Sequence, residues 1–328
     1  MAGETLVRVG ALLERGEAAE AARTLMLAAA SGDAAAVAEL ARWRVAGNVV
    51  RRDLAAARAL FARAAEAGDA EAALVHAHFL ASGTGGPSDW PGALASLRRL
   101  APSSAPARAQ LGRLAVMELD EEGGPRRPPA TRPLSDSPFA IAAQGFATAA
   151  ECDYLVAAVE AQFQPSVVVD PASGRLVPHP IRTSDGAFFG VFAEDLVVNA
   201  INRRIAALSG TRVEQGETLQ LLRYARGAQY RAHVDALPAE ANQRIATVLV
   251  YLTDDYEGGE TQFVRTGLAY RGRKGDALLF RNVDAAGRPD PMALHAGLPV
   301  TRGVKVIASR WIRAERFSFP PPQPLVAL

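Results

Sequence analysis

The sequence is short of cysteine, of excess charge and of long apolar runs, and each shortage excludes a class of protein. The single cysteine, Cys152, cannot form an internal disulfide or a cysteine-based zinc site. The 36 lysines and arginines nearly balance the 35 aspartates and glutamates, so no basic excess points to a nucleic-acid partner. No apolar run reaches the roughly 18 residues of a membrane helix, and the first residues lack a secretory signal. These shortages predict a cytoplasmic protein with no membrane partner.

The 328 residues are enough for two domains, and two parts of the sequence differ in their pattern of apolar residues. Residues 1–118 are alanine-rich, with apolar side chains at spacings of three and four, which predicts a helical domain. Residues 119–138 are rich in proline and glycine and predict a linker. Residues 139–319 predict a second domain of α+β type, and residues 320–328 a proline-rich tail.

Three features of the first domain recur 36 residues later: Gly32-Asp33-Ala34 as Gly68-Asp69-Ala70, Gly47 as Gly83, and Asp53 as Asp89. A fixed period of this length indicates stacked helix pairs. The pattern over residues 18–118 resembles Sel1-like repeats, which are related to tetratricopeptide repeats. The resemblance implies a concave surface for a protein or peptide. A generic alanine-rich helical domain remains the alternative.

The second domain predicts two helices followed by short strands. The helices are expected at residues 149–162 and 194–209, and the strands at residues 218–224, 244–253, 277–281 and 304–312. This order favours a double-sheet jelly roll with supporting helices, a fold whose mouth holds small ligands.

The most specific chemical signal is the segment His233-Val234-Asp235, followed at a distance by His295. Side chains two apart on a strand point to one side, so His233 and Asp235 can converge, and a neighbouring strand can bring His295 to them. Two imidazoles and one carboxylate on one face of a metal favour Fe(II). The alternative for His233 is an ordinary strand histidine bonded to a loop.

A lysine on a predicted strand strengthens the signal. The alternation over residues 304–313 places Lys305, Ile307, Ser309, Trp311 and Arg313 on one face. If that face points inward, Lys305 is a buried cation that needs an anionic partner, which a bound dicarboxylate would supply. An edge strand with Lys305 in solvent is the alternative.

Beyond these residues, the second domain resembles the prolyl 4-hydroxylase branch of the Fe(II)/2-oxoglutarate dioxygenases. The resemblance covers about residues 139–314 and is carried, in family order, by residues 181–186, 219–224, 230–235, 243–252, 257–261, 274–280 and 295–300, then Lys305 and Trp311. It implies a double-stranded β-helix (jelly roll) with supporting helices. Together with the N-terminal α-helical repeat stack, the expected fold is multidomain, α and α+β.

The resemblance implies a role for each matching residue. His233, Asp235 and His295 would be the catalytic metal ligands, and Lys305 would pair with the distal carboxylate of 2-oxoglutarate. Tyr224, Thr261 and Trp311 would be further 2-oxoglutarate contacts, while Tyr230 and Arg244 would lie near the substrate. The family often has histidine two residues after the tryptophan, where this sequence has Arg313.

The implied reaction is hydroxylation of a C–H bond, with succinate and CO2 as co-products. Its implied cofactors are Fe(II), 2-oxoglutarate and O2, with ascorbate as reductant. A prolyl residue in a peptide or protein is the expected target, docked by the helical repeats. The alternatives are an oxygenase of a free amino acid or small metabolite, and a non-catalytic interaction module built on the repeats. Nucleic-acid demethylation by the same chemistry is disfavoured by the charge balance.

Overall fold

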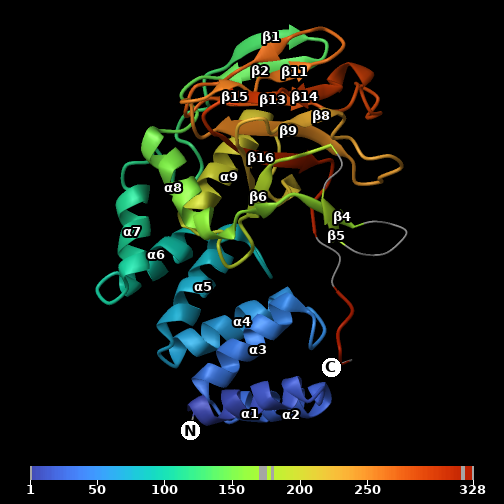
Figure 1. The fold of residues 1–328 in the computed structure, drawn as a ribbon. Helices are drawn as coiled ribbons and strands as arrows, with labels where there is room; N and C mark the ends of the chain where they lie inside the picture. The colour runs from blue at the N-terminus through green and yellow to red at the C-terminus, as the bar shows by residue number, and fades with distance from the viewer. Residues whose placement is uncertain (1, 170–175, 179–180, 319–321, 327–328) are drawn as a thin grey trace. The chain divides into compact units, whose positions relative to one another are not determined.

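The computed structural model describes residues 2–169, 176–178, 181–318 and 322–326 (Figure 1). The chain divides into two compact units. One, the helical unit, comprises Met1–Gly123, Glu194–Asn199 and Phe319–Leu328. The other, the sheet unit, comprises Gly124–Ala193 and Ala200–Ser318.

Alanine-rich helices build the first part of the helical unit. They are α1 (Ala2–Glu14), α2 (Ala18–Ala30), α3 (Ala34–Ala46), α4 (Leu54–Glu66), α5 (Ala70–Ser82), α6 (Trp90–Leu100) and α7 (Ala105–Leu114). Their small side chains let consecutive helices pack closely, around buried Phe61 and Phe79 with ring centroids 5.4 Å apart.

The 36-residue repeat of the sequence is a repeat of helix caps. Four aspartates accept a hydrogen bond from a backbone N–H at the start of a helix: Asp33, Asp53, Asp69 and Asp89. Gly47 and Gly83 end α3 and α5 with φ of 72° each, a left-handed conformation that glycine adopts without strain. The predicted helical repeat is confirmed.

Two segments outside residues 1–123 also belong to the helical unit. The backbone N–H groups of Leu325 and Val326 donate to the carbonyls of Asn48 and Val49, at 2.8 and 2.9 Å. The Leu196 N–H donates to Gln110 Oε1 at 3.4 Å. The expected tail, residues 320–328, therefore pairs with the helical unit at Leu325 and Val326, while residues 320–321 and 327–328 lie outside the described residues.

The sheet unit contains two main antiparallel sheets (Figure 1). The larger has the order β1-β2-β13-β9-β16-β7-β6-β3, and the smaller the order β12-β11-β14-β8. The large-sheet strands are β1 (Arg132–Asp136), β2 (Phe139–Ala143), β3 (Gln164–Pro165), β6 (Asp185–Phe188), β7 (Gln220–Tyr224), β9 (Arg244–Tyr251), β13 (Ala277–Arg281) and β16 (Lys305–Arg313). The small-sheet strands are β8 (Tyr230–His233), β11 (Thr261–Phe263), β12 (Ala269–Tyr270) and β14 (His295–Gly297). Two further pairs join β4 (Val167–Val169) to β5 (Leu176–Pro178) and β10 (Glu257–Gly258) to β15 (Val300–Arg302).

The core of the sheet unit lies between these sheets. Large-sheet side chains such as Leu249 and Ile307 pack in one cluster with Phe263 of the small sheet. The two sheets thus form a jelly roll that is closed by apolar packing, and the predicted fold class is confirmed.

Supporting helices complete the sheet unit. Helix α8 (Ala149–Val159) continues into a 3-10 turn at Glu160–Gln162, and α9 spans Leu196–Ser209, as expected from the sequence, with Ala200–Ser209 in the sheet unit. Thr148 and Glu151 form a capping box at the start of α8. Arg204 of α9 binds the Glu151 carboxylate through two nitrogens, each at 2.9 Å. Short 3-10 turns also occur at Val213–Gln215 and Pro291–Ala293.

One expectation needs correction within the predicted linker. Residues 119–138 contain β1, which pairs with β2 at the edge of the large sheet. Pro133 is tolerated there because an edge strand does not need every N–H for the ladder. The rest of the proposed boundary, from residue 119 to the start of β1, lies outside any regular helix or strand.

Among the described residues, the search for a helix with the length and apolarity to span a bilayer finds none.

Candidate active site

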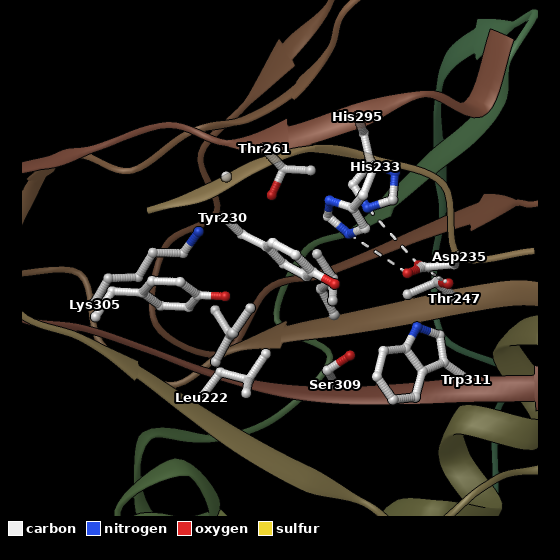
Figure 2. A pocket seen from close by; sticks show the side chains of 14 residues that line it. Leu222, Tyr230, His233, Asp235, Thr247, Thr261, His295, Lys305, Ser309 and Trp311 are labelled. Carbon is white, nitrogen blue, oxygen red and sulfur yellow. Dashed lines mark hydrogen bonds and ion pairs between the residues drawn. The ribbon is translucent and has the colours of Figure 1, made fainter. Parts of the chain in front are cut away.

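A cavity that is partly open to solvent lies in the jelly roll (Figure 2). Eight of the nine site residues expected from the sequence line it, and Arg244 is the exception. The lining comprises Leu222, Tyr224, Tyr230, His233, Asp235, Thr247, Leu249, Thr261, His295, Gly297, Lys305, Ile307, Ser309 and Trp311. The inward face of β16 was therefore predicted correctly from Lys305 to Trp311.

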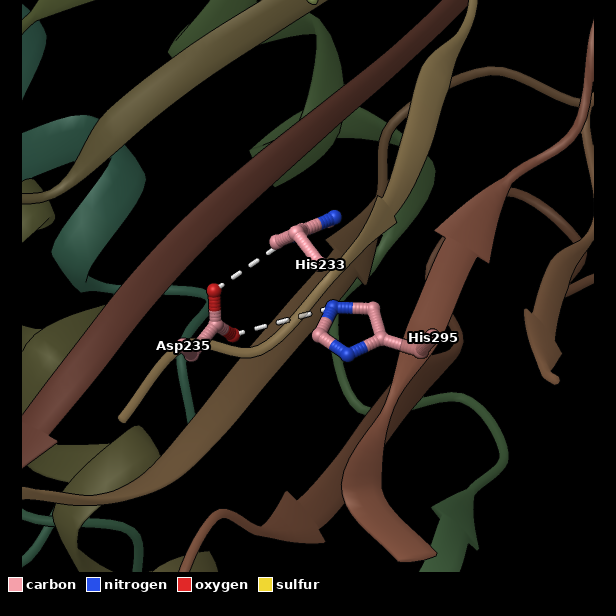
Figure 3. Close-up of side chains that lie close together, drawn as sticks. All are labelled: His233, Asp235 and His295. Atoms are coloured by element: carbon pink, nitrogen blue, oxygen red, sulfur yellow. Dashed lines mark ion pairs between the residues drawn. The ribbon is translucent and has the colours of Figure 1, made fainter. Parts of the chain in front are cut away.

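Three side chains converge at one end of the cavity (Figure 3). His233 ends β8 and His295 begins β14, and the two residues are register partners in the small sheet. Asp235 lies in the bend after β8, with Oδ1 3.6 Å from His233 Nε2 and Oδ2 3.8 Å from His295 Nε2. One donor atom from each residue lies within 4.8 Å of the other two, close enough for all three to hold one metal ion.

The backbone fixes which nitrogen each histidine presents. His233 Nδ1 lies 2.8 Å from the Arg231 carbonyl, and His295 Nδ1 lies 2.9 Å from the Ala293 carbonyl. A carbonyl only accepts, so each Nδ1 carries the proton and each Nε2 keeps its lone pair for a metal. Burial lowers the pKa of His295, which favours the neutral ligand form.

Asp235 supplies the negative charge of this cluster. Burial alone would raise its pKa, but the contact with His233, the neighbouring His295 and the Thr247 hydroxyl together lower the pKa below its ordinary value. The carboxylate is therefore ionised, as a metal ligand must be. This donor set, two imidazoles and one carboxylate, fits Fe(II).

Lys305 lies at the opposite end of the cavity from Asp235 (Figure 2). It is only 3% exposed, and its Nζ donates to the Gly259 carbonyl at 2.6 Å. Burial lowers its pKa from 10.5 to about 8, partly opposed by Glu260. Among the residues that the structure describes, no carboxylate forms an ion pair with Lys305. The site thus holds a buried ammonium that an acidic ligand would stabilise.

Aromatic and hydroxyl groups surround this ammonium. Nζ lies 5.5 Å from the ring centroids of both Tyr224 and Tyr251. Lys305 and Tyr224 are register partners on β16 and β7. The Thr261 hydroxyl lies 3.2 Å from the Tyr251 hydroxyl. These groups offer hydrogen bonds to a carboxylate held by Lys305.

Tyr230 covers the metal end of the cavity. Its ring stacks on His233 with centroids 3.5 Å apart and planes 18° apart. The family resemblance implied a place for Tyr230 near the substrate, and it did not indicate this stack on the imidazole. The stack restricts rotation of the His233 ring, in addition to its hydrogen bond to Arg231.

Arg244 lies behind the cavity wall. Its guanidinium sits 3.7 Å from the Trp311 ring centroid and binds the Glu217 carboxylate through two nitrogens, at 2.6 and 3.0 Å. Arg313 binds the same carboxylate at 2.6 Å. The residue that departs from the family pattern thus shares a buried counter-ion with Arg244.

Several contributors were missed from the sequence. Glu217 supplies the shared carboxylate, Thr247 donates to Asp235, and the Gly259 carbonyl accepts from Lys305. The Thr247 contact could have been indicated by strand alternation, which places Thr247 on the same face of β9 as Leu249 and Tyr251. The other two depend on contacts between distant segments.

The comparisons with known proteins match this site. The family model of the 2OG-Fe(II) oxygenase superfamily matches residues 219–313, which include the three converging residues and Lys305. "Probable prolyl 4-hydroxylase 4" from Arabidopsis thaliana is 35% identical over 216 residues, 58% of this chain and 72% of that protein. "Prolyl 4-hydroxylase 1" from the same plant is 36% identical over 204 residues, 56% of this chain and 72% of that protein.

Two solved structures are also similar to parts of the chain. A viral collagen prolyl hydroxylase from Paramecium Bursaria Chlorella virus-1 is 30% identical, with a TM-score of 0.45, over 55% of this chain and 98% of that one. A Sel1 repeat protein from Oxalobacter formigenes is 33% identical, with a TM-score of 0.28, over 29% of this chain and 28% of that one.

The extent and identity of the plant matches, together with the family model over the cavity strands, decide the family. The chain belongs to the prolyl 4-hydroxylase family of the 2OG-Fe(II) oxygenase superfamily.

Proposed function

We propose that this protein hydroxylates a prolyl residue of a peptide or protein, with His233, Asp235 and His295 holding Fe(II). One observation carries the proposal. The donor cluster lies at one end of a cavity, and at the other end lies the buried ammonium of Lys305, which forms no ion pair among the described residues. Bound iron, 2-oxoglutarate and O2 would supply the oxidising chemistry, with succinate and CO2 as co-products.

The chain's own residues orient these groups. Lys305 would bind the distal carboxylate of 2-oxoglutarate, with Tyr224 and Thr261 as further donors to it. Filling the cavity in this way replaces water around the ammonium with a fixed counter-charge. Trp311 would form part of the wall that keeps the co-substrate in place.

The substrate side is assigned to Tyr230 and Arg244. Tyr230 lies directly over His233, so a peptide entering the metal end of the cavity would meet its ring. Arg244 would act through Trp311, on which its guanidinium stacks. The names of the plant relatives support a prolyl target.

The helical unit would dock the peptide or protein substrate. The repeated caps of α3 to α6 support this, because stacked helix pairs characteristically present a binding surface. Photo-crosslinking of a bound substrate peptide, mapped by mass spectrometry, tests it. Cross-links to α1–α7 are expected, and cross-links confined to the sheet unit would contradict the docking proposal.

Two conditions complete the proposal. Ascorbate would act as the reductant that keeps iron ferrous, so omitting it should shorten the period of linear turnover. A reducing cytoplasmic setting is consistent with a ferrous ion and with the single, buried Cys152. Fractionation of host cells would test the compartment.

The direct test follows succinate formation by the full chain with Fe(II), 2-oxoglutarate and a proline-rich peptide. Wild type should form succinate and add one oxygen atom to the peptide, and His233→Ala should do neither. Thr253→Val, at a hydroxyl of the sheet unit that bonds, among the described residues, only to the backbone of Val304 and Val306, serves as the control and should retain activity. Wild-type turnover by His233→Ala would remove the assignment.

The same assay separates the remaining alternatives. An oxygenase of a free amino acid would hydroxylate free proline in preference to the peptide. A non-catalytic module would leave 2-oxoglutarate unconsumed.

A further inference from the structure

A chain of buried hydrogen bonds leads away from the metal end of the cavity. The Thr247 hydroxyl lies 2.6 Å from Asp235 Oδ2, and Asn282 Nδ2 lies 2.9 Å from the same hydroxyl oxygen. Thr247 is 1% exposed and Asn282 is 2% exposed, so both side chains are almost fully buried. All three side chains belong to the sheet unit.

The direction of each hydrogen bond follows from the groups. An ionised Asp235 can only accept, so the single hydroxyl proton of Thr247 points to it. The hydroxyl oxygen then accepts from the Asn282 amide. Because the Asn282 amide donates to this oxygen from the other side, the Thr247 hydroxyl stays oriented to donate its hydrogen bond to the Asp235 carboxylate.

The backbone explains why Asp235 needs such support. His233 and His295 are held in β8 and β14, and are register partners there. Asp235 lies in the bend after β8 and has no strand partner. Its carboxylate is fixed to the large sheet by Thr247 instead.

Thr247 itself is held firmly. It lies on β9, with Trp311 of β16 as its register partner on one side and Phe280 of β13 on the other. Asn282 follows β13, and its backbone N–H donates to the Ile245 carbonyl at 2.9 Å. The two side chains therefore start from fixed backbone positions on adjacent strands.

We infer that Thr247, supported by Asn282, is a positioning residue that sets the rotation of the Asp235 carboxylate and so preorganises the metal site. The inference rests on the proposed function, since it assumes that Asp235 is a metal ligand. Two of the donors lie on paired strands of the small sheet, the third lies in the bend after β8, and the Thr247 hydroxyl of the large sheet holds that carboxylate beside the histidines. Groups that orient metal ligands in this way typically change metal affinity by about 10–100-fold when removed.

The test is calorimetric titration of the full-length, metal-free protein with Mn(II) alone, which avoids both oxidation and substrate. Thr247→Val keeps the side-chain shape and removes the hydroxyl, and should weaken Mn(II) binding about tenfold or more. Thr247→Ser restores the hydroxyl and should return the affinity to that of wild type. Asn282→Ala leaves the Thr247 hydroxyl in place and should cause a smaller loss.

A matched control lies two residues beyond the same strand. The Thr253 hydroxyl accepts from the Val306 N–H and donates to the Val304 carbonyl, without contact to the donor cluster. Thr253→Val should therefore bind Mn(II) as wild type does. Circular dichroism of each metal-free variant checks folding. If Thr247→Val does not fold, the comparison of Thr247→Ser and Asn282→Ala with wild type carries the test.

The outcomes separate this inference from the function on which it rests. Wild-type Mn(II) affinity in Thr247→Val would overturn the positioning role while leaving the metal site intact. An equal loss in Thr247→Val and Thr247→Ser would also overturn it, because the hydroxyl would then not be the cause. Unchanged Mn(II) binding in His233→Ala would instead overturn the proposed metal site, and the inference with it.

Discussion

Replacing Lys305 by methionine should separate two effects of its buried ammonium: the free energy that burial costs the folded protein, and the contribution of the ammonium to 2-oxoglutarate binding. Burial lowers the pKa of Lys305 from 10.5 to about 8. At about 1.4 kcal/mol per pKa unit, the charged form costs the ligand-free folded protein about 3 kcal/mol below pH 8. Methionine removes this cost but leaves the Gly259 carbonyl without its donor, which costs about 1–3 kcal/mol. The variant should therefore be as stable as wild type at pH 7, or up to about 2 kcal/mol more stable.

The pH dependence of the difference is the sharper measurement. Because the folded pKa lies below the unfolded one, the unfolded chain binds more protons between pH 8 and 10.5. Wild type should therefore gain stability relative to Lys305→Met across this window, by up to about 3 kcal/mol. Burial also raises the pKa values of the neighbouring Tyr224 and Tyr251, but both proteins contain them, so they cancel in the difference.

The other lysine of the sequence provides a matched control. Lys274 pairs with Asp153 outside the cavity, and this hydrogen bond raises its pKa. Its contribution to stability is present at lower pH and is lost as the pH rises through the folded pKa, so wild type should lose stability relative to Lys274→Met there. Between pH 8 and 10.5, where the difference for Lys305→Met should rise, the difference for Lys274→Met should stay flat, because its loss begins only above pH 10.5.

Two assays are needed. Urea unfolding of ligand-free wild type, Lys305→Met and Lys274→Met, at steps from pH 7 to 10.5, measures stability. Calorimetric titration of 2-oxoglutarate into each metal-loaded protein, under anaerobic conditions, measures binding. Lys305→Met should lose about 2–5 kcal/mol of 2-oxoglutarate binding, and Lys274→Met should lose none. A flat or falling difference for Lys305→Met between pH 8 and 10.5 would refute the account of its burial. Unchanged 2-oxoglutarate affinity would refute the carboxylate pairing.

Two further predictions concern structure around the site and in the repeats. Glu217→Gln removes the charge shared by Arg244 and Arg313 and should lower the free energy of unfolding by about 3 kcal/mol, measured in urea, with Mn(II) affinity unchanged. A loss below about 1 kcal/mol would place this network among weak surface pairs. Asp33→Ala and Asp69→Ala remove equivalent N-caps and should each cost about 1 kcal/mol in thermal unfolding. A clear cost at only one of the two would argue against equivalent repeats.

Local patterns explain how much of this molecule could be predicted. The aspartates and glycines of the repeat act within one helical turn, so their 36-residue spacing predicted the stacked helix pairs, and the structure shows these residues to be the helix caps. The alternation from Lys305 to Trp311 predicted the inward face of β16, because side-chain direction along a strand is a local property. His233 and His295 meet because β8 and β14 pair, whereas Asp235 reaches them from the bend after β8 and not from the strand that its spacing indicated.

What could not be predicted depends on pairing between distant segments. The strand β1 was expected to be linker, since its proline and charges have low strand propensity, and only pairing with β2 makes it a strand. The two-residue strands β10 and β12 likewise exist through their partners. The resemblance implied a place for Arg244 near the substrate, but the sequence could not predict its ion pair with Glu217, 27 residues away, or its stacking on Trp311.

The most direct test of the central claim is a crystal structure of the full chain grown anaerobically with Fe(II) and 2-oxoglutarate. We expect a single iron ligated by His233 Nε2, His295 Nε2 and an Asp235 carboxylate oxygen, with the far carboxylate of 2-oxoglutarate paired to Lys305 Nζ. Iron bound without one of these three residues, or a co-substrate carboxylate that does not reach Lys305, would contradict it.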